Sequence, residues 1–281
     1  MLLTRVITAL AILPVVLGML FFASGAAWSV FALAIALIAC WEWSRMCHLS
    51  PGGQGAYLVA SGAIGAFVWL MYLHLVPGNF VALALTGFII ATVFWIVGVP
   101  FWLANQLRPS SSTCAVAGWI VVWPVWFALV VLRDTSPWLL LALAALVWVA
   151  DIAAYFAGKG FGKRKLAPAV SPGKTWEGVY GALAGVVAYG VALAWIANAY
   201  ETPLTSIFDD GAATVVIVAM LGLTAVSVVG DLFESWMKRG AGLKDSSNLL
   251  PGHGGLLDRI DALTSTLPVA ALALYARHAA G

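Results

Sequence analysis

Hydrophobic residues in this chain come in long blocks that short polar connections separate. A block of about 20 apolar residues is the length that an α-helix needs to cross a bilayer, whereas a helix of a soluble protein carries a polar stripe. The pattern therefore predicts an all-α polytopic membrane protein with about nine transmembrane helices. The approximate bounds of the blocks are 6–22, 26–41, 56–75, 80–102, 117–132, 138–156, 178–200, 212–230 and 262–275. The short connection after the first block and Pro268 in the last one leave eight or ten spans open.

The composition excludes a soluble globular protein. Hydrophobic residues make up 63% of the chain and charged residues only 9%, whereas a soluble domain carries about 25% charged residues. Arg5 and the small residues at 23–27 imitate a signal peptide. Further apolar blocks follow at once, so we expect a retained first membrane helix. Cys40, Cys47 and Cys114 lack paired spacing, so we expect neither a disulfide nor a zinc site.

Lysine and arginine are concentrated in alternate connections, and this asymmetry predicts the orientation. Basic residues favour the cytoplasmic side of a membrane. The N-terminus is then cytoplasmic, the C-terminus lies on the opposite side, and two long polar loops, 157–177 and 231–261, face the cytoplasm. We divide the chain into an N-terminal region of about five transmembrane helices, residues 1–135, and a catalytic transmembrane region, residues 136–281.

The polar stretch 231–261 carries acidic residues beside apolar blocks. Asp231, Glu234, Ser235 and Lys238 share one helical face by their spacing. A carboxylate at membrane depth costs a few kcal/mol unless it is paired, hydrated or bound to metal, so it is a functional candidate. A solvated helix end with a Glu–Lys pair is the alternative, and it gives no reason for Asp231.

Asp258 and Asp261 lie one helical turn apart at the start of the last block. Two carboxylates on one face suit Mg²⁺, which keeps waters and takes further ligands from phosphates. The alternative is acidic charge that stabilises a helix N-terminus, and it explains one aspartate more readily than two. We predict Asp231, Asp258 and Asp261 as metal ligands and catalytic residues, with Lys238 as a fourth catalytic residue.

Basic residues and glycines lie between these acids, and such groups bind phosphate. The predicted substrate-binding residues of this stretch are Arg239, Lys244, His253 and Arg259. The preference of basic residues for the cytoplasmic side explains the lysines and arginines equally well, but not the acids among them. His253 could be a general acid or base, a phosphate donor or a structural turn residue.

A second polar stretch, 151–177, supplies further candidates: Asp151, Tyr155, Ser171, Lys174 and Thr175. The string Gly173-Lys174-Thr175 is similar to the end of a P-loop. Pro168 stands where that motif needs its first glycine, and no β-strand precedes it, so we reject this interpretation. A phosphate clamp at a helix start is an alternative, because helix N-termini attract anions.

The signature Ser235-x-Met237-Lys238-Arg239, then Lys244-Asp245, then residues 250–261, Leu-Pro-Gly-His-Gly-Gly-Leu-Leu-Asp-Arg-Ile-Asp, resembles that of CDP-diacylglycerol synthases (phosphatidate cytidylyltransferases). The segment 171–178 and the positions Asp151, Tyr155 and Gly158 are also similar to that family. The region before about residue 140 resembles it only in being membrane helices.

The resemblance implies that CTP and phosphatidic acid give CDP-diacylglycerol and pyrophosphate in phospholipid biosynthesis. It also implies dependence on Mg²⁺, a second cation such as K⁺, a homodimer, the inner membrane of a bacterium and an active site that faces the cytoplasm. No nucleic acid is expected as a partner.

Chemistry and resemblance together suggest a division of roles. The three aspartates would hold metal, and Lys238, Arg239, Lys244 and Arg259 would bind the triphosphate. Ser171, Lys174 and Thr175 would close over one phosphate, and Asp151 and Tyr155 would line the cavity. The lipid would enter sideways from the bilayer.

Two other functions use similar parts. Cytidylyl or phosphoryl transfer to a polyprenyl lipid would need the same polar groups. A transporter also carries intramembrane acids and Gly/Pro breaks. The polar groups here cluster at one membrane face, however, and no inverted repeat is visible, which disfavours transport.

Overall fold

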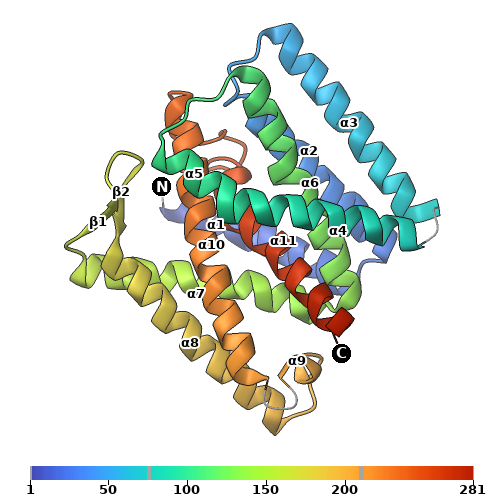
Figure 1. Cartoon of the computed structure of the whole chain (residues 1–281), viewed down its shortest axis with the longest axis vertical. Coiled ribbons are helices and arrows are strands. Elements are labelled where there is room, and N and C mark those ends of the chain that lie inside the picture. The colour runs from blue at the N-terminus through green and yellow to red at the C-terminus, as the bar shows by residue number, and fades with distance from the viewer. Residues whose placement is uncertain (1, 75–76, 209–211, 281) are drawn as a thin grey trace.

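The computed structural model describes residues 2–74, 77–208 and 212–280, and most of them are helical (Figure 1). Each of the predicted apolar blocks lies on a helix, so the all-α expectation is confirmed. The helices are α1 (Leu2–Phe22), α2 (Gly25–Ser44), α3 (Pro51–His74), α4 (Pro77–Val93), η1 (Phe94–Gly98), α5 (Val99–Ala104), α6 (Ser111–Thr135), α7 (Pro137–Phe161), α8 (Trp176–Ala199), α9 (Thr205–Phe208), α10 (Ala213–Gly240) and α11 (Leu257–Ala280).

Within the described residues, 7 helical segments are long and apolar enough to cross a membrane. They are Gly25–Ser44, Pro51–Leu73, Gly78–Ala104, Ser111–Thr135, Pro137–Phe161, Trp176–Ala199 and Ala213–Gly240. The apolar part of α1, Ile7–Phe22, is shorter, and α11 is not among the seven. The chain is therefore an integral membrane protein, while the full count of about nine spans stays a prediction.

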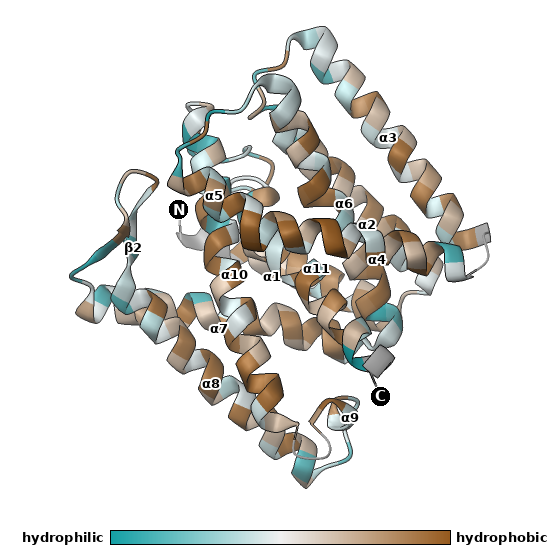
Figure 2. Cartoon of the chain, viewed as in Figure 1, coloured by the Kyte–Doolittle hydropathy of each residue, from teal (hydrophilic) through white to brown (hydrophobic). Residues whose placement is uncertain are grey.

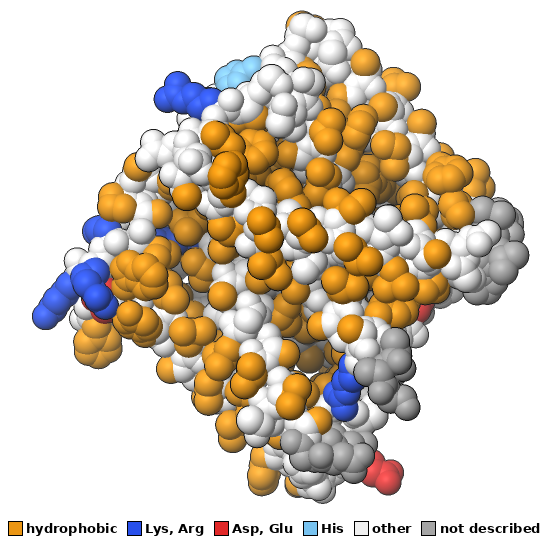
Figure 3. All heavy atoms as spheres, in the orientation of Figure 1, with side chains coloured by type: hydrophobic (Ala, Val, Ile, Leu, Met, Phe, Trp, Pro, Cys, Tyr) orange, Lys and Arg blue, Asp and Glu red, His pale blue; other side chains and the backbone are white. Residues whose placement is uncertain are grey.

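The surface of the molecule supports a membrane environment. Hydrophobic residues run along the helices, and hydrophilic residues gather at helix ends and connections (Figure 2). Apolar side chains cover much of the visible face, and large ones such as Phe22 and Val59 are 90% and 74% exposed (Figure 3). Water would penalise such a surface, whereas lipid tails do not.

One end of the bundle collects the connections that the charge pattern places in the cytoplasm. The carbonyl oxygen of Gly240, at the end of α10, lies 3.3 Å from Nε2 of His48, which follows α2. Arg45 donates to the carbonyl of Ser246 in the α10–α11 connection, at 3.1 Å. Ser111, at the start of α6, donates to the carbonyl of His48.

The opposite end collects the remaining connections. Arg133, near the end of α6, donates to the carbonyl of Leu20 at 3.2 Å. Arg277 of α11 donates to the carbonyl of Ile207 in α9 at 2.7 Å. Successive long helices thus run in alternating directions, as the prediction requires; the side of the membrane on which each end lies stays a prediction.

The core of the molecule draws on both predicted regions. α6 packs against α2, α4 and α11, and α11 also packs against α4. Trp43 of α2 and Phe233 of α10 are both buried, with ring centroids 6.1 Å apart. The division at residue 135 stays a prediction, but the helices that carry the candidate site rest on the N-terminal ones.

A β-hairpin, which the sequence did not suggest, lies between α7 and α8. Strands β1 (Lys165–Ala167) and β2 (Ser171–Thr175) pair antiparallel, with Lys165 opposite Thr175. Gly181 lets helices α7 and α8 approach closely, since a Cβ at that position would lie only 2.2 Å from the Cβ of Ala157. Gly173, Lys174 and Thr175 lie on β2 itself, so the rejected P-loop is indeed not formed.

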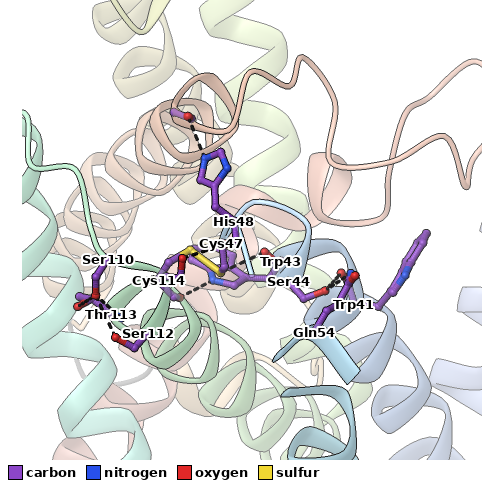
Figure 4. Close-up of a disulfide and its surroundings, with 12 residues drawn as sticks. Trp41, Trp43, Ser44, Cys47, His48, Gln54, Ser110, Ser112, Thr113 and Cys114 are labelled. Atoms are coloured by element: carbon purple, nitrogen blue, oxygen red, sulfur yellow. Dashed lines mark hydrogen bonds between the residues drawn. A yellow bond between two sulfur atoms is a disulfide. The ribbon is translucent and has the colours of Figure 1, made fainter. Parts of the chain in front are cut away.

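The expectation of no disulfide was wrong. Cys47, which follows α2, is bonded to Cys114 in the first turns of α6, with 5.2 Å between the Cα atoms (Figure 4). The two residues are 67 positions apart, so their spacing gave no signal. The indole N–H of Trp43 donates to the carbonyl of Cys114 at 2.8 Å, at the same junction.

Candidate active site

A cavity of about 460 Å³ lies between α7, the hairpin, α8 and α10. The structure brings a subset of the predicted site residues together in its wall: Asp151, Tyr155, Lys174, Thr175 and Asp231. Much of the remaining wall is apolar and includes Val179 and Val228. A lining that combines charged and apolar side chains suits a ligand that has a charged head and a lipid tail.

An ion pair between Lys174 and Asp231 joins the hairpin to α10 across this cavity. Both side chains are partly exposed to the cavity, at 26% and 30%. Asp151 of α7 lies close enough to both members of this pair to interact with their charges. It also interacts with the charge of Arg259 on α11. The two polar stretches of the sequence, 151–177 and 231–261, therefore meet at one site.

Thr175 is buried and begins α8. Its hydroxyl oxygen accepts the backbone N–H of Gly178 at 3.1 Å, which is the geometry of an N-cap. Ser171 lies at the other end of β2, opposite Ala167, and is not among the described residues that line the cavity. Lys174 is therefore the member of the predicted clamp whose charge points into the cavity.

A buried lysine, Lys238, lies between two carboxylates next to the cavity. Its Nζ atom is 3.1 Å from Oε1 of Glu234 and 2.5 Å from Oδ1 of Asp258. The other oxygen of Glu234, Oε2, is buried and accepts no hydrogen bond from the described residues. The spacing of Glu234 and Lys238 on one helical face was predicted, and their ion pair confirms it.

Asp258 is surrounded by donors. Oδ2 accepts the N–H groups of Ser246 and Gly255 at 2.9 and 2.7 Å, and the hydroxyl of Ser246 at 3.0 Å. Burial opposes ionisation of Asp258, but hydrogen bonds from Lys238, Gly255 and Ser246 outweigh it and hold the pKa of this carboxyl below its usual value. Asp258 is thus a carboxylate at neutral pH.

Asp261 lies one turn further along α11 and has fewer donors. Oδ1 accepts the N–H of Ala262 at 2.7 Å. Burial, and then the negative charge of Asp231, raise the pKa of Asp261. The negative charge of Asp231, which lines the cavity, thus acts on Asp261, and Asp261 in turn acts on Glu234 in the Lys238 cluster.

The other predicted phosphate ligands lie in or beside the α10–α11 connection. Arg239 donates to the carbonyl of Leu243 at 3.0 Å and is exposed. Lys244 and Arg259 are exposed as well. His253 lies in a turn in which its N–H donates to Leu250, and its Nδ1 is buried without a hydrogen-bond partner among the described residues.

Sequence reasoning missed Glu42 of α2, which is 0% exposed. Its carboxylate accepts hydrogen bonds from Ser246 and Ser247 in the α10–α11 connection. The signal in the sequence was an acidic residue directly after an apolar block, in a region that seemed to offer membrane helices alone.

The net negative charge of the site favours a bound cation, but the described side chains are not arranged as a complete metal site. Carboxylates outnumber basic groups: Asp151, Asp231, Glu234, Asp258 and Asp261 surround Lys174, Lys238 and Arg259. Among the described residues, however, no three His, Cys, Asp or Glu side chains are placed to hold a metal ion. Mg²⁺ is often bound by one or two carboxylates with waters and substrate phosphates, so Asp231 and Asp261 fit that mode.

Comparison with known proteins gives a consistent result. A family model described as "Cytidylyltransferase family" matches residues 3–276. The chain is 42% identical to a phosphatidate cytidylyltransferase of Pseudomonas aeruginosa, over 98% of each chain. It is 37% identical to one of Brucella suis, over 93% of this chain and 89% of that one. A phosphatidate cytidylyltransferase of Thermotoga maritima is 37% identical over 63% of this chain and 66% of its own length.

Replacing Lys238 by methionine should destabilise the protein strongly. Lys238→Met keeps the apolar stem but leaves Glu234 and Asp258 buried without their shared cation. We expect a loss of about 3–5 kcal/mol, read as a lower thermal unfolding midpoint in detergent. The control Lys244→Met removes an exposed lysine and should change stability by no more than about 0.5 kcal/mol. Equal stability of the two variants would contradict the role of Lys238.

Proposed function

The chain belongs to the cytidylyltransferase family, and we propose that it makes CDP-diacylglycerol and pyrophosphate from CTP and phosphatidic acid. The observation that carries this proposal is the cavity in which Lys174 pairs with Asp231 beside Asp261. It offers a cation for phosphate, a pair of carboxylates for metal and apolar walls for a lipid. The names of the relatives support the same two substrates.

The proposed reaction needs no general base. A phosphate oxygen of phosphatidic acid is already ionised at neutral pH and attacks the α-phosphorus of CTP. The bond from that phosphorus to the oxygen bridging to the β-phosphate breaks, and pyrophosphate leaves with the electron pair. The barrier is mainly repulsion between anions and the charge on the leaving group, which positive groups relieve.

Lys174 is the group of this chain best placed to bind the triphosphate. Its ion pair with Asp231 holds the ammonium at the cavity wall before substrate arrives. A phosphate oxygen would replace the Asp231 carboxylate as the partner of Lys174. That exchange would free Asp231 at the moment when the extra negative charge enters the site. Arg259 would add positive charge from α11.

Asp231 and Asp261 would hold Mg²⁺ together with substrate phosphates and water. A bound Mg²⁺ neutralises charge that develops on the phosphates. Asp258 as a third ligand stays a prediction, since its two oxygens accept hydrogen bonds from Lys238, Ser246 and Gly255. The second cation, such as K⁺, rests on the family resemblance.

We also propose that the protein lies in the inner membrane of a bacterium with this site at the cytoplasmic face. Support comes from the basic connections, which gather at the same end of the bundle as the site. CTP would then reach the cavity from the cytoplasm, and phosphatidic acid would enter from the adjacent leaflet. A homodimer would be the assembled form.

The reaction itself is tested with the purified chain in detergent. CTP labelled on the α-phosphate and phosphatidic acid should give labelled CDP-diacylglycerol and an equal amount of pyrophosphate. A polyprenol in place of phosphatidic acid should give no product. Release of CDP with the polyprenol, or absence of CDP-diacylglycerol, would overturn the proposal.

Lys174→Ala should weaken the binding of CTP. Removing a charged hydrogen-bond donor costs about 1.5–3 kcal/mol, so KM for CTP should rise about 10- to 100-fold, or turnover should be lost. Steady-state kinetics at saturating phosphatidic acid measure this change. Lys165→Ala removes an exposed lysine of β1 and serves as the control. Unchanged KM and kcat for Lys174→Ala would remove this residue from the site.

Removal of divalent metal should stop turnover, and Mg²⁺ should restore it. Asp261→Asn should raise the Mg²⁺ concentration that gives half-maximal activity by at least about tenfold, because one carboxylate of the pair is lost. Asp134→Asn, at the opposite end of the bundle, is the matched control. Full activity in excess chelator would rule out the metal proposal.

A further inference from the structure

Glu42 is a buried acid in an apolar helix, and its surroundings show why it is tolerated. It lies near the C-terminal end of α2 and is 0% exposed. An isolated carboxylate in such a place would cost several kcal/mol. No ion pair of Glu42 is found among the side chains that the structure describes, so its hydrogen-bond partners identify its role.

Among the described residues, the donors to the Glu42 carboxylate all lie more than 200 positions further along the chain. Oε1 accepts the hydroxyl of Ser247 at 2.5 Å and the N–H of Leu256 at 2.8 Å. Oε2 accepts the hydroxyl of Ser246 at 3.0 Å and the N–H of Leu257 at 2.6 Å. The carboxylate thus ties the middle of the α10–α11 connection to the start of α11 and caps that helix, whose first N–H groups have no partner within the helix.

The same connection holds Asp258. The hydroxyl of Ser246 has one proton and lies 3.0 Å both from Glu42 and from Asp258. Gly255 fits between these groups: a Cβ there would lie 2.0 Å from the Ser246 hydroxyl and 2.6 Å from Glu42. Glu42 therefore fixes the connection, and the connection fixes the start of α11, where Asp258 lies on the first turn and Asp261 on the next.

We propose that Glu42 is a positioning residue for cytidylyl transfer, acting through Ser246, Ser247 and the start of α11. This inference rests on the proposed function. A carboxylate suits the task because four donors need two acceptor oxygens. A glutamine would supply one oxygen and turn an NH₂ group toward two donors. It keeps the shape of the side chain but removes half of the contacts.

The test compares Glu42→Gln with the wild type in three measurements. Loss of a hydrogen bond that holds a site residue in place from behind commonly lowers activity about 10- to 100-fold. We expect kcat of Glu42→Gln to fall by that factor. KM for CTP should change less than kcat, because Lys174, the main proposed phosphate ligand, lies on β2, away from this connection. Hydrogen exchange in peptides covering residues 246–258 should become faster.

A control separates positioning from loss of stability. Leu132→Ala removes a buried side chain of α6 near the opposite end of the bundle and should lower the unfolding midpoint without lowering kcat. If Glu42→Gln and Leu132→Ala change kcat, KM and exchange in the same way, Glu42 is merely structural and the inference fails. Unchanged kcat and exchange in folded Glu42→Gln would also overturn it.

A second variant decides the matter if Glu42→Gln does not fold. Ser247→Ala removes one donor and leaves Glu42 its other three. It should lower kcat below the wild-type value and change KM for CTP less than kcat; an unaltered kcat would overturn the inference. Inactive wild-type protein would overturn the proposed function instead, and the exchange rates would still show whether Glu42 holds the connection.

Discussion

Burial of charge in an apolar bundle is the constraint on which this site depends. A carboxylate removed from water must find donors or a cation, or the fold loses several kcal/mol. Glu42, Glu234 and Asp258 meet this requirement by recruiting Lys238 and the polar groups of residues 246–257. The α10–α11 connection therefore folds onto α2 and α10. The same hydrogen bonds and ion pairs that stabilise the buried charges also assemble the site.

The sequence predicted what depends on neighbouring positions. Apolar blocks of bilayer length predicted the helices, because helix formation and membrane insertion both respond to local composition. Spacing of three and four residues placed Glu234 beside Lys238, and their ion pair followed. The meeting of Lys174 with Asp231 did not follow from spacing. The charge pattern placed the two polar stretches on the same side of the membrane, and phosphate chemistry together with the resemblance to a family suggested that they share one site.

The sequence did not predict contacts between distant segments. Glu42 finds Ser246 more than 200 positions away, and Cys47 finds Cys114 across 67. Such pairs form where helices happen to cross, and neither periodicity nor motif spacing reports a crossing. The β-hairpin was not predicted for another reason. Its strands are short and lie in a polar loop without the alternation that marks a half-buried strand.

Spacing alone treats Asp258 and Asp261 as equivalent, but their surroundings differ. Hydrogen bonds from Lys238, Ser246 and Gly255 already stabilise the charge on Asp258, so a metal ion there would have to displace donors. Asp261 interacts with the negative charge of Asp231, and its carboxylate accepts one hydrogen bond from the described residues, from the N–H of Ala262. A cation gains most where negative charge is least compensated. The proposed Mg²⁺ would therefore gain most at Asp231 and Asp261, whereas the charge of Asp258 is already balanced by its donors.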